Sequence, residues 1–113
     1  MSKKNLLLSA PPYDVERAIK RLGVDLRTAR ARRNLTVAQV AEKIGTGLRA
    51  VLDAEKGKPS TGLAVYVALL WAYDLLDQLD EVATPARDER GMALALAHDR
   101  KRARLSKMLS DDF

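Results

Sequence analysis

The side chains of this sequence that could do chemistry are cations grouped around one short stretch. Arg49 lies within that stretch, and its planar guanidinium can donate two hydrogen bonds to the edge of a guanine. Lys56 and Lys58 follow within ten residues, and ammonium groups in such positions bind backbone phosphates. A solvated turn accounts for these two lysines equally well. The residue types favour binding to a nucleic acid over a reaction.

Residue types that catalyse reactions are scarce. His98 is the single histidine, and its only acidic neighbour is the adjacent Asp99, because no carboxylate lies at helical spacing from it. The sequence has no cysteine, which excludes disulfides and thiolate metal sites. It also has no glycine-rich phosphate loop and no nucleophile elbow. We therefore expect no enzymatic activity, no cofactor and no metal.

The charge is unevenly distributed over the 113 residues, whose net charge is +5. Residues 1–33 hold nine basic residues against three acidic ones, and residues 34–60 hold four against three. Residues 61–83 hold four acidic residues and no basic one, whereas residues 84–113 hold seven basic residues against five acidic ones. This polarity suits a protein that places one end on an anionic polymer, although a solvated basic helix is the alternative.

The apolar pattern argues against a membrane protein. No apolar run approaches the roughly 18 residues of a membrane span, and the apolar run near the start is too short for a signal peptide. Apolar residues make up 47% of the chain, which is enough for the core of one small domain. We expect a cytoplasmic protein without membrane contact.

The stretch from Leu35 to Gly57 must position the cations, and it begins with the pattern of a short helix. Apolar residues recur at helical spacing from Val37 to Ile44. Thr36 can cap this helix through its hydroxyl, and Gly45 can end it because glycine readily adopts a positive φ. Ala41 is small enough for a close crossing with another helix. This pattern predicts the first helix of a helix–turn–helix.

A second short helix is expected after the turn, with Val51 and Ala54 facing inward. Its outward side chains are then Leu48, Arg49, Leu52 and Asp53. Two short helices at this angle usually place the second in the DNA major groove. Leucine can touch only a thymine methyl, and aspartate repels phosphate unless it accepts from cytosine. The scaffold therefore predicts DNA binding, while the outward residues leave open a protein-interaction module with weak or no specific DNA binding.

The pattern resembles the Xre/Cro type of helix–turn–helix, the fold of phage repressors, on Leu35-Thr36, Ala38, Val40-Ala41, Gly45, Val51 and Glu55-Lys56-Gly57. The resemblance runs from about Leu26 to Leu76 and implies an all-α bundle of about five helices with flexible tails. In that family an arginine at the position of Arg30 pairs with a glutamate at the position of Glu55. A bidentate bond is thus expected to tie the first helix to the third. We assign DNA contacts to Thr36, Thr46, Gly47, Leu48, Arg49, Leu52, Asp53, Lys56 and Lys58.

A narrower resemblance points to the HipB-like antitoxins, on Leu70-Trp71-Ala72, Leu75-Leu76-Asp77 and Pro85-Ala86-Arg87-Asp88. These antitoxins are DNA-binding partners of HipA-type Ser/Thr kinases. The resemblance implies an autoregulating repressor that binds a palindromic operator in double-stranded DNA and restrains a HipA-like kinase.

The sequence suggests three regions. Residues 1–12 are expected to form a flexible arm, whose Lys3 and Lys4 either reach phosphate or a minor groove or are disordered. Residues 13–84 form the DNA-binding and dimerisation domain. It begins with a long helix from Asp14 to Arg33, in which Gly23 permits a bend into two helices. Four arginines near the end of this helix suit both phosphate contact and the helix dipole: Arg27, Arg30, Arg32 and Arg33.

A very apolar helix is expected from Leu63 to Trp71, capped by Ser60 or Thr61, with Tyr66 and Tyr73 placing their polar tips at the edge of an interface. A helix that is apolar all round is buried on several sides, so we expect a homodimer. Its interface residues are Val67, Leu70, Trp71, Leu75 and Leu79. An acidic helix should follow from Leu75 to Ala83, with Leu75, Leu76, Leu79 and Val82 facing inward.

Residues 85–113 form a C-terminal extension that we expect to be partly helical or disordered. A helix is favoured from Arg87 to His98, although the alternating apolar residues allow a strand over residues 91–96. A basic run, RKRARLSK, follows over residues 100–107. This tail is either disordered, bound to DNA, or docked on a partner with Phe113 as an aromatic anchor.

Overall fold

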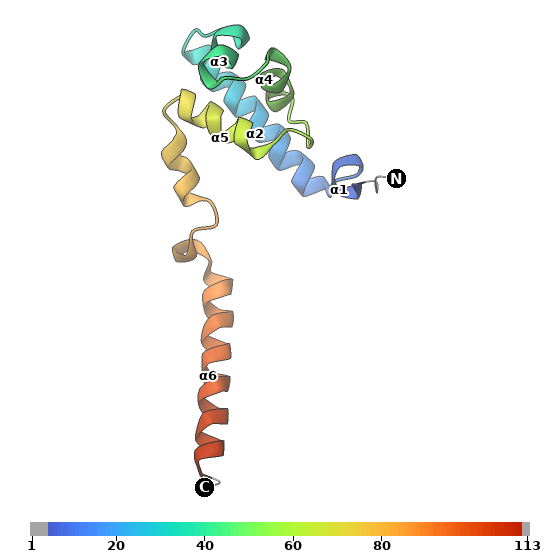
Figure 1. Cartoon of the computed structure of the whole chain (residues 1–113). Coiled ribbons are helices and arrows are strands. Elements are labelled where there is room, and N and C mark those ends of the chain that lie inside the picture. The colour runs from blue at the N-terminus through green and yellow to red at the C-terminus, as the bar shows by residue number, and fades with distance from the viewer. Residues whose placement is uncertain (1–4, 112–113) are drawn as a thin grey trace. The chain divides into compact units, whose positions relative to one another are not determined.

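Helices form all the regular secondary structure of the computed structural model, which describes residues 5–111 (Figure 1). The described chain contains six α-helices and two 3-10 helices, and no strand lies within it. The all-α class is therefore confirmed. Lys3, Lys4 and Phe113 lie outside the described residues.

The chain divides into two compact units between Leu79 and Asp80. The first unit holds α1 (Leu6–Ser9), α2 (Tyr13–Arg32), α3 (Val37–Ile44), α4 (Leu48–Glu55) and α5 (Leu63–Ala72). The 3-10 helix η1 (Leu76–Glu81) spans the division, and the second unit continues with η2 (Pro85–Arg87) and α6 (Glu89–Asp111). The predicted domain bounds after residues 12 and 84 stay a prediction.

The core of the first unit lies where α4 packs against α2, α3 and α5, and where α3 packs against α5. Small side chains let these short helices approach closely, and larger aliphatic and tyrosine side chains fill the space between them. The buried residues are Leu26, Ala29, Val40, Ala41, Val51, Ala54, Tyr66, Leu69, Ala72 and Tyr73. The inward positions predicted for Val51 and Ala54 are confirmed, since neither side chain is exposed.

Local chemistry accounts for the bounds of α3. The Thr36 hydroxyl accepts a hydrogen bond from the Gln39 amide at 3.1 Å, and the Gln39 side chain accepts from the Thr36 amide at 2.9 Å. This reciprocal capping box satisfies two amides that have no partner inside the helix. Gly45 ends α3 in the left-handed conformation, with φ of +75°. Both predicted ends are therefore confirmed.

Four local predictions are wrong. α2 runs unbroken through Gly23, which lies in a close helix contact and does not bend the chain. Gly62 precedes α5 without a side-chain cap, so neither Ser60 nor Thr61 caps it. The acidic helix is the shorter 3-10 helix η1, and it leaves Leu76 and Val82 exposed. The fourth concerns the tyrosines, because both Tyr66 and Tyr73 are buried in the core and not at an edge.

The second unit is more helical than the sequence indicates. The alternative strand over residues 91–96 is wrong, because these residues belong to the continuous helix α6. The Asp88 carboxylate accepts a hydrogen bond from the Gly91 amide at 2.9 Å and thereby supports the first turn of α6. The expected arm likewise contains a single helical turn, α1, which the Asn5 side chain caps. No described helix is long and apolar enough to cross a membrane.

Candidate nucleic-acid interface

The second helix of the helix–turn–helix, α4, presents the side chains that the sequence assigned to DNA contact. Leu48 is 52% exposed and Arg49 is exposed, so both are accessible at the start of the helix. Leu52 and Asp53 are half-buried one turn later. Gly47 caps α4 without a side chain, and no atom lies within 4 Å of a Cβ built there. The beginning of α4 is thus free of obstruction within the described unit.

One largely buried ion pair connects α4 to the rest of the unit. Arg30 Nε donates to Glu55 Oε2 at 2.8 Å, and Arg30 Nη2 donates to Glu55 Oε1 at 2.9 Å. Its remaining nitrogen, Nη1, donates to the Leu35 carbonyl at 2.9 Å. The two side chains are only 17% and 6% exposed, and the hydrogen bond to Glu55 raises the pKa of Arg30 above its ordinary value. The guanidinium therefore connects α2, the residue before the α3 cap, and the end of α4.

Two glycines bring α2 and the end of α4 into close contact. A Cβ on Gly23 would lie 2.6 Å from the Ala54 carbonyl oxygen and 2.7 Å from the Glu55 carbonyl oxygen. A Cβ on Gly57 would lie 2.5 Å from the Lys20 Cα, and Gly57 also has a φ of +69°. Both positions require glycine because backbone approaches backbone. The sequence shows these glycines but not the contact that they make, because the partners are distant in the chain.

Arg33 has a structural role that the sequence reasoning missed. Its guanidinium donates to the Ala29 carbonyl at 3.0 Å and to the Tyr73 carbonyl at 2.7 Å. The same group lies 5.6 Å from the centre of the Tyr73 ring, a cation–π distance. Burial raises the pKa of this tyrosine. Arg33 thus connects the carboxyl end of α5 to α2, and its guanidinium is occupied by contacts within the unit.

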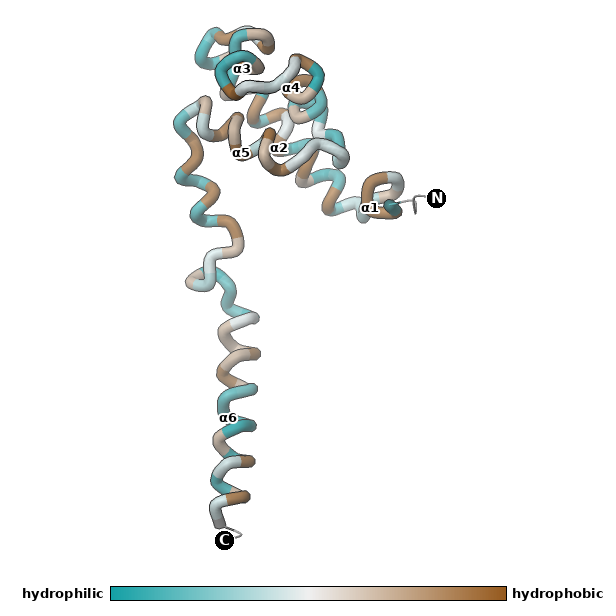
Figure 2. The backbone as a smooth tube through the Cα atoms, viewed as in Figure 1, coloured by the Kyte–Doolittle hydropathy of each residue, from teal (hydrophilic) through white to brown (hydrophobic). Residues whose placement is uncertain are grey.

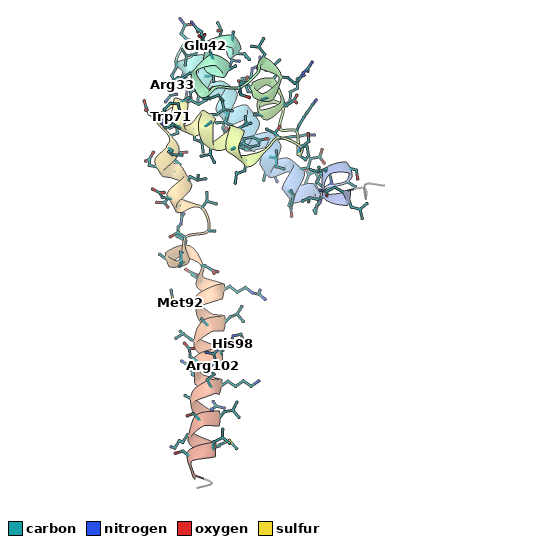
Figure 3. All side chains as sticks on the ribbon, viewed as in Figure 1. Arg33, Glu42, Trp71, Met92, His98 and Arg102 are labelled. Carbon is teal, nitrogen blue, oxygen red and sulfur yellow. The ribbon has the colours of Figure 1, made fainter. Side chains whose placement is uncertain are left out.

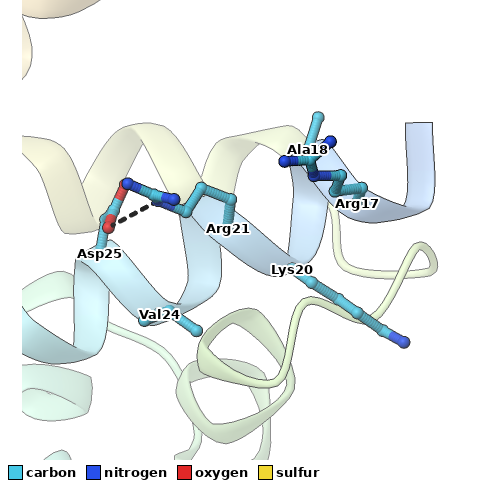
Figure 4. Close-up of a pocket in the computed structure, with 6 residues that line it drawn as sticks. All are labelled: Arg17, Ala18, Lys20, Arg21, Val24 and Asp25. Atoms are coloured by element: carbon cyan, nitrogen blue, oxygen red, sulfur yellow. Dashed lines mark ion pairs between the residues drawn. The ribbon is translucent and has the colours of Figure 1, made fainter. Parts of the chain in front are cut away.

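The basic residues in the first half of α2 are also partly neutralised. Lys20 forms an ion pair with Glu16 at 2.8 Å, and Arg21 forms one with Asp25 at 3.5 Å. Figure 4 shows the second pair at one end of a shallow hollow, which is lined by Arg17, Ala18, Lys20, Arg21, Val24 and Asp25. Glu16 and Asp25 thus lie beside Lys20 and Arg21, which makes these two cations less available to an anionic partner.

Asp53 and Lys58 form an ion pair at the end of α4. Lys58 Nζ lies 3.3 Å from Asp53 Oδ1, and the Lys58 amide donates to the Asp53 carbonyl at 3.0 Å. The ion pair lowers the repulsion that Asp53 would exert on phosphate. It also makes Lys58, which the sequence assigned to phosphate binding, less available for that contact. Lys56 is exposed and forms no ion pair with any described residue.

The fold brings Lys56 together with a cation from α2. A hollow of about 220 Å³ is lined by Arg27, Arg30, Leu52, Glu55 and Lys56. Among these lining residues Arg30 and Glu55 are paired with each other, so Arg27 and Lys56 supply the net positive charge of the hollow. Arg27 is exposed, and no described residue forms an ion pair with it. This arrangement can hold an anion beside α4 through two side chains from different helices.

The residues predicted for a dimer interface lie on α5 and just after it. Trp71 is 52% exposed, and Val67, Leu70, Leu75 and Leu79 are half-buried. The outer side of α5 forms an entirely apolar shallow hollow with Leu63, Ala64, Val67, Ala68, Trp71 and Leu76 around it. Figure 3 labels Trp71 in this part of the first unit. Lys43 lies 5.7 Å from the Trp71 ring centre and donates to the Ala72 carbonyl, so it contacts the end of α5.

Comparison with known proteins supports the assignment of the helix pair. A family model described as a helix-turn-helix domain matches residues 21–83, which is more than half of the chain. No curated protein and no solved structure matches the sequence. The matched segment includes α3, α4 and α5 in full, together with the Arg30–Glu55 ion pair and the hollow that Arg27 and Lys56 line. The chain therefore belongs to the helix-turn-helix domain family of DNA-binding regulators.

Proposed function

We propose that this protein is a sequence-specific transcriptional repressor that binds a palindromic operator as a homodimer. The observation that carries the proposal is the accessible start of α4, with Arg49 exposed, beside the Arg27–Lys56 hollow. A helix in the major groove can read bases through its first residues while cations at its end bind the flanking phosphates. In a two-fold dimer, two copies of α4 would enter successive major grooves about one turn apart.

Base reading is expected to depend on Arg49 and overall affinity on the phosphate contacts. Arg49→Ala should weaken binding to the cognate operator by about 1–3 kcal/mol and binding to random DNA very little, if the guanidinium contacts guanine. Lys56→Ala should weaken binding to both DNAs about equally, because phosphate carries no sequence information. Fluorescence anisotropy at two salt concentrations, with DNA from upstream of the gene and with random DNA, measures both effects.

The control for Lys56→Ala is Lys58→Ala, which removes a cation that Asp53 already neutralises and should therefore weaken DNA binding less. Salt should weaken the binding of the unmodified protein steeply, since each neutralised phosphate releases counterions. Equal losses for Arg49→Ala on both DNAs would remove the base-reading role from Arg49. Binding that does not depend on salt would contradict the phosphate contacts.

The homodimer is proposed to form through the apolar hollow on the outer side of α5. A contiguous exposed apolar surface of this kind is uncommon on soluble monomers and is typical of an interaction site. Single exposed apolar residues, in contrast, are common on soluble proteins. Leu63 is the most exposed of its large apolar side chains, at 73%, so a substitution there leaves the core of the unit intact.

Light scattering at micromolar concentration should give a mass twice the 12.5 kDa of one chain. Leu63→Glu should raise the dimer dissociation constant about 100-fold or more, because two carboxylates would be buried in the two-fold contact. Leu6→Glu is the matched control, since Leu6 is also 73% exposed but lies on α1. A 12.5 kDa species from the unmodified protein would rule out this interface.

We further propose that the repressor is an antitoxin that restrains a HipA-like Ser/Thr kinase and regulates its own operon. The support is the resemblance of α5 and the segment after it to HipB-like antitoxins. The kinase is expected to bind outside α4, through the acidic residues of η1 or through the C-terminal extension. Co-purification of a kinase encoded by a neighbouring gene with the full chain, and its loss from a version that ends at Thr84, would place the contact on the extension. If neither version retains kinase, the antitoxin role fails.

A second candidate function follows from the composition of the α4 surface. Leu48 is exposed, and Leu52 and Asp53 follow on the same side, whereas polar side chains read base edges better than leucine does. These residues favour a protein-interaction module whose helix–turn–helix has weak or no specific DNA binding. Absence of binding to both cognate and random DNA in the anisotropy experiment would select this function.

A further inference from the structure

The second unit ends in a helix that the rest of this unit leaves uncovered. Every described side chain of α6 from Met92 to Ser110 is exposed, including leucines and methionines that are 52–65% exposed. In Figure 3 the side chains of α6 project from the ribbon on all sides. Isolated helices are marginally stable in water, because most helical stability in proteins comes from packing. A function for α6 must therefore come from its surface chemistry.

The C-terminal half of α6 is strongly basic. Residues 100–107 hold five cations and no carboxylate: Arg100, Lys101, Arg102, Arg104 and Lys107. Within the described part of the second unit none of the five forms an ion pair, in contrast to Arg87 of the same unit and to Lys20 and Arg21 of the first unit. The charge of this segment is therefore available to a partner.

Helical spacing gathers these cations on one face. Arg100, Arg104 and Lys107 lie at intervals of four and three residues, so their side chains are neighbours on the helix surface. Ala93 and Ala97 continue the same face toward the start of α6. Like charges at this spacing destabilise a free helix, and an anionic partner would relieve that repulsion. The small alanines leave the approach to the face open.

The distribution of apolar residues disfavours a membrane surface. In the first half of α6, Leu94 lies nearly opposite Met92 and Leu96 around the helix, since successive residues are separated by about 100°. Figure 2 shows hydrophobic and hydrophilic residues interspersed along this helix. In the second half of α6, Leu105, Met108 and Leu109 share one side, but Lys101 lies in the same row and interrupts it. A helix that binds a membrane surface needs one continuous apolar face, which this pattern does not provide.

We infer that the Arg100–Arg104–Lys107 face of α6 is a second DNA-binding element that contacts backbone phosphates of double-stranded DNA. This inference rests on the proposed function, and it adds a sequence-independent contact in a separate unit from α4. A linear polyanion matches a row of unpaired cations better than a folded acidic protein does, because its charges repeat along one direction. The contact raises the affinity and the salt dependence without changing which bases are read.

The test is the salt dependence of binding by the full chain to a random-sequence DNA duplex. The variant R100Q/R104Q/K107Q removes three charges, and glutamine retains a good helix propensity. Three lost phosphate contacts should reduce the slope of log affinity against log salt by about 2.7. The matched control is K20Q/R21Q/R87Q, which removes three cations that are already ion-paired. Its slope should change by less than about 1.

A second variant separates charge from helix structure. R100K/R104K keeps the positive charge and should retain the slope of the unmodified protein, with circular dichroism reporting the helix content of each variant. A slope for R100Q/R104Q/K107Q equal to that of the control would overturn the inference while leaving the proposed function intact. Loss of binding to anionic phosphatidylglycerol vesicles with unchanged DNA binding would also overturn it, in favour of a membrane. No DNA binding by the unmodified chain would overturn the proposed function together with the inference.

Discussion

Replacing Glu55 with alanine is expected to lower the free energy of unfolding by about 3–5 kcal/mol. The substitution leaves the Arg30 guanidinium, which is only 17% exposed, with the Leu35 carbonyl as its remaining partner in the described unit. A buried charge without its counterion is far more costly than the net contribution of the pair, because the desolvation is no longer offset. Urea denaturation followed by circular dichroism measures the change.

The control for this prediction is an ion pair of the same length on the surface. Arg87 and Glu81 also lie 2.8 Å apart, but their side chains are 71% and 65% exposed. Glu81→Ala should therefore cost less than about 1 kcal/mol. The double variant Arg30→Met/Glu55→Leu should recover much of the stability, since apolar side chains often replace a buried pair without loss. A cost for Glu55→Ala no greater than that of Glu81→Ala would contradict the structural role of Arg30.

Gly23→Ala should lower the free energy of unfolding by about 1–3 kcal/mol, although helix propensity alone predicts a gain of about 1 kcal/mol. The added methyl would lie 2.6–2.9 Å from three backbone atoms of residues 54, 55 and 57, so α2 or α4 must shift. Because that shift moves α4, DNA affinity should fall together with stability. Chemical denaturation and anisotropy on the same samples measure both quantities.

The propensity effect is calibrated by Ala18→Gly in the same helix. Ala18 is exposed, so this substitution should cost about 1 kcal/mol through backbone entropy alone and should leave DNA affinity unchanged. The sign of the Gly23→Ala effect then decides the matter. A gain in stability of about 1 kcal/mol would show that α2 and α4 do not approach each other closely at this glycine.

The sequence by itself determined the features that depend on neighbouring residues. Thr36 and Gly45 mark the ends of α3 because a hydroxyl cap and a positive φ act within a few residues of the chain. The helical periodicity likewise predicted that Val51 and Ala54 face the core. The all-α class was implied by the family resemblance. The pairing of Arg30 with Glu55 came from the family resemblance and not from spacing.

Only the tertiary structure decided which charged residues are paired within the protein and which stay available to an anionic partner. Arg33 contacts Tyr73, whereas the arginine Arg27 lines a hollow beside α4. In the same way, Lys58 pairs with Asp53, whereas Lys56 lines that hollow. The low helix propensity of Gly23 permitted a bend in α2. The close contact with α4 explains why a glycine lies within this unbroken helix. For Arg33 and Gly23 the contacting partner lies on another element of the fold. For Lys58 the partner lies close in sequence, but it is one of several acidic residues that could pair with this lysine. Free energies of pairing and close approach depend on distances in space, which local residue patterns do not contain.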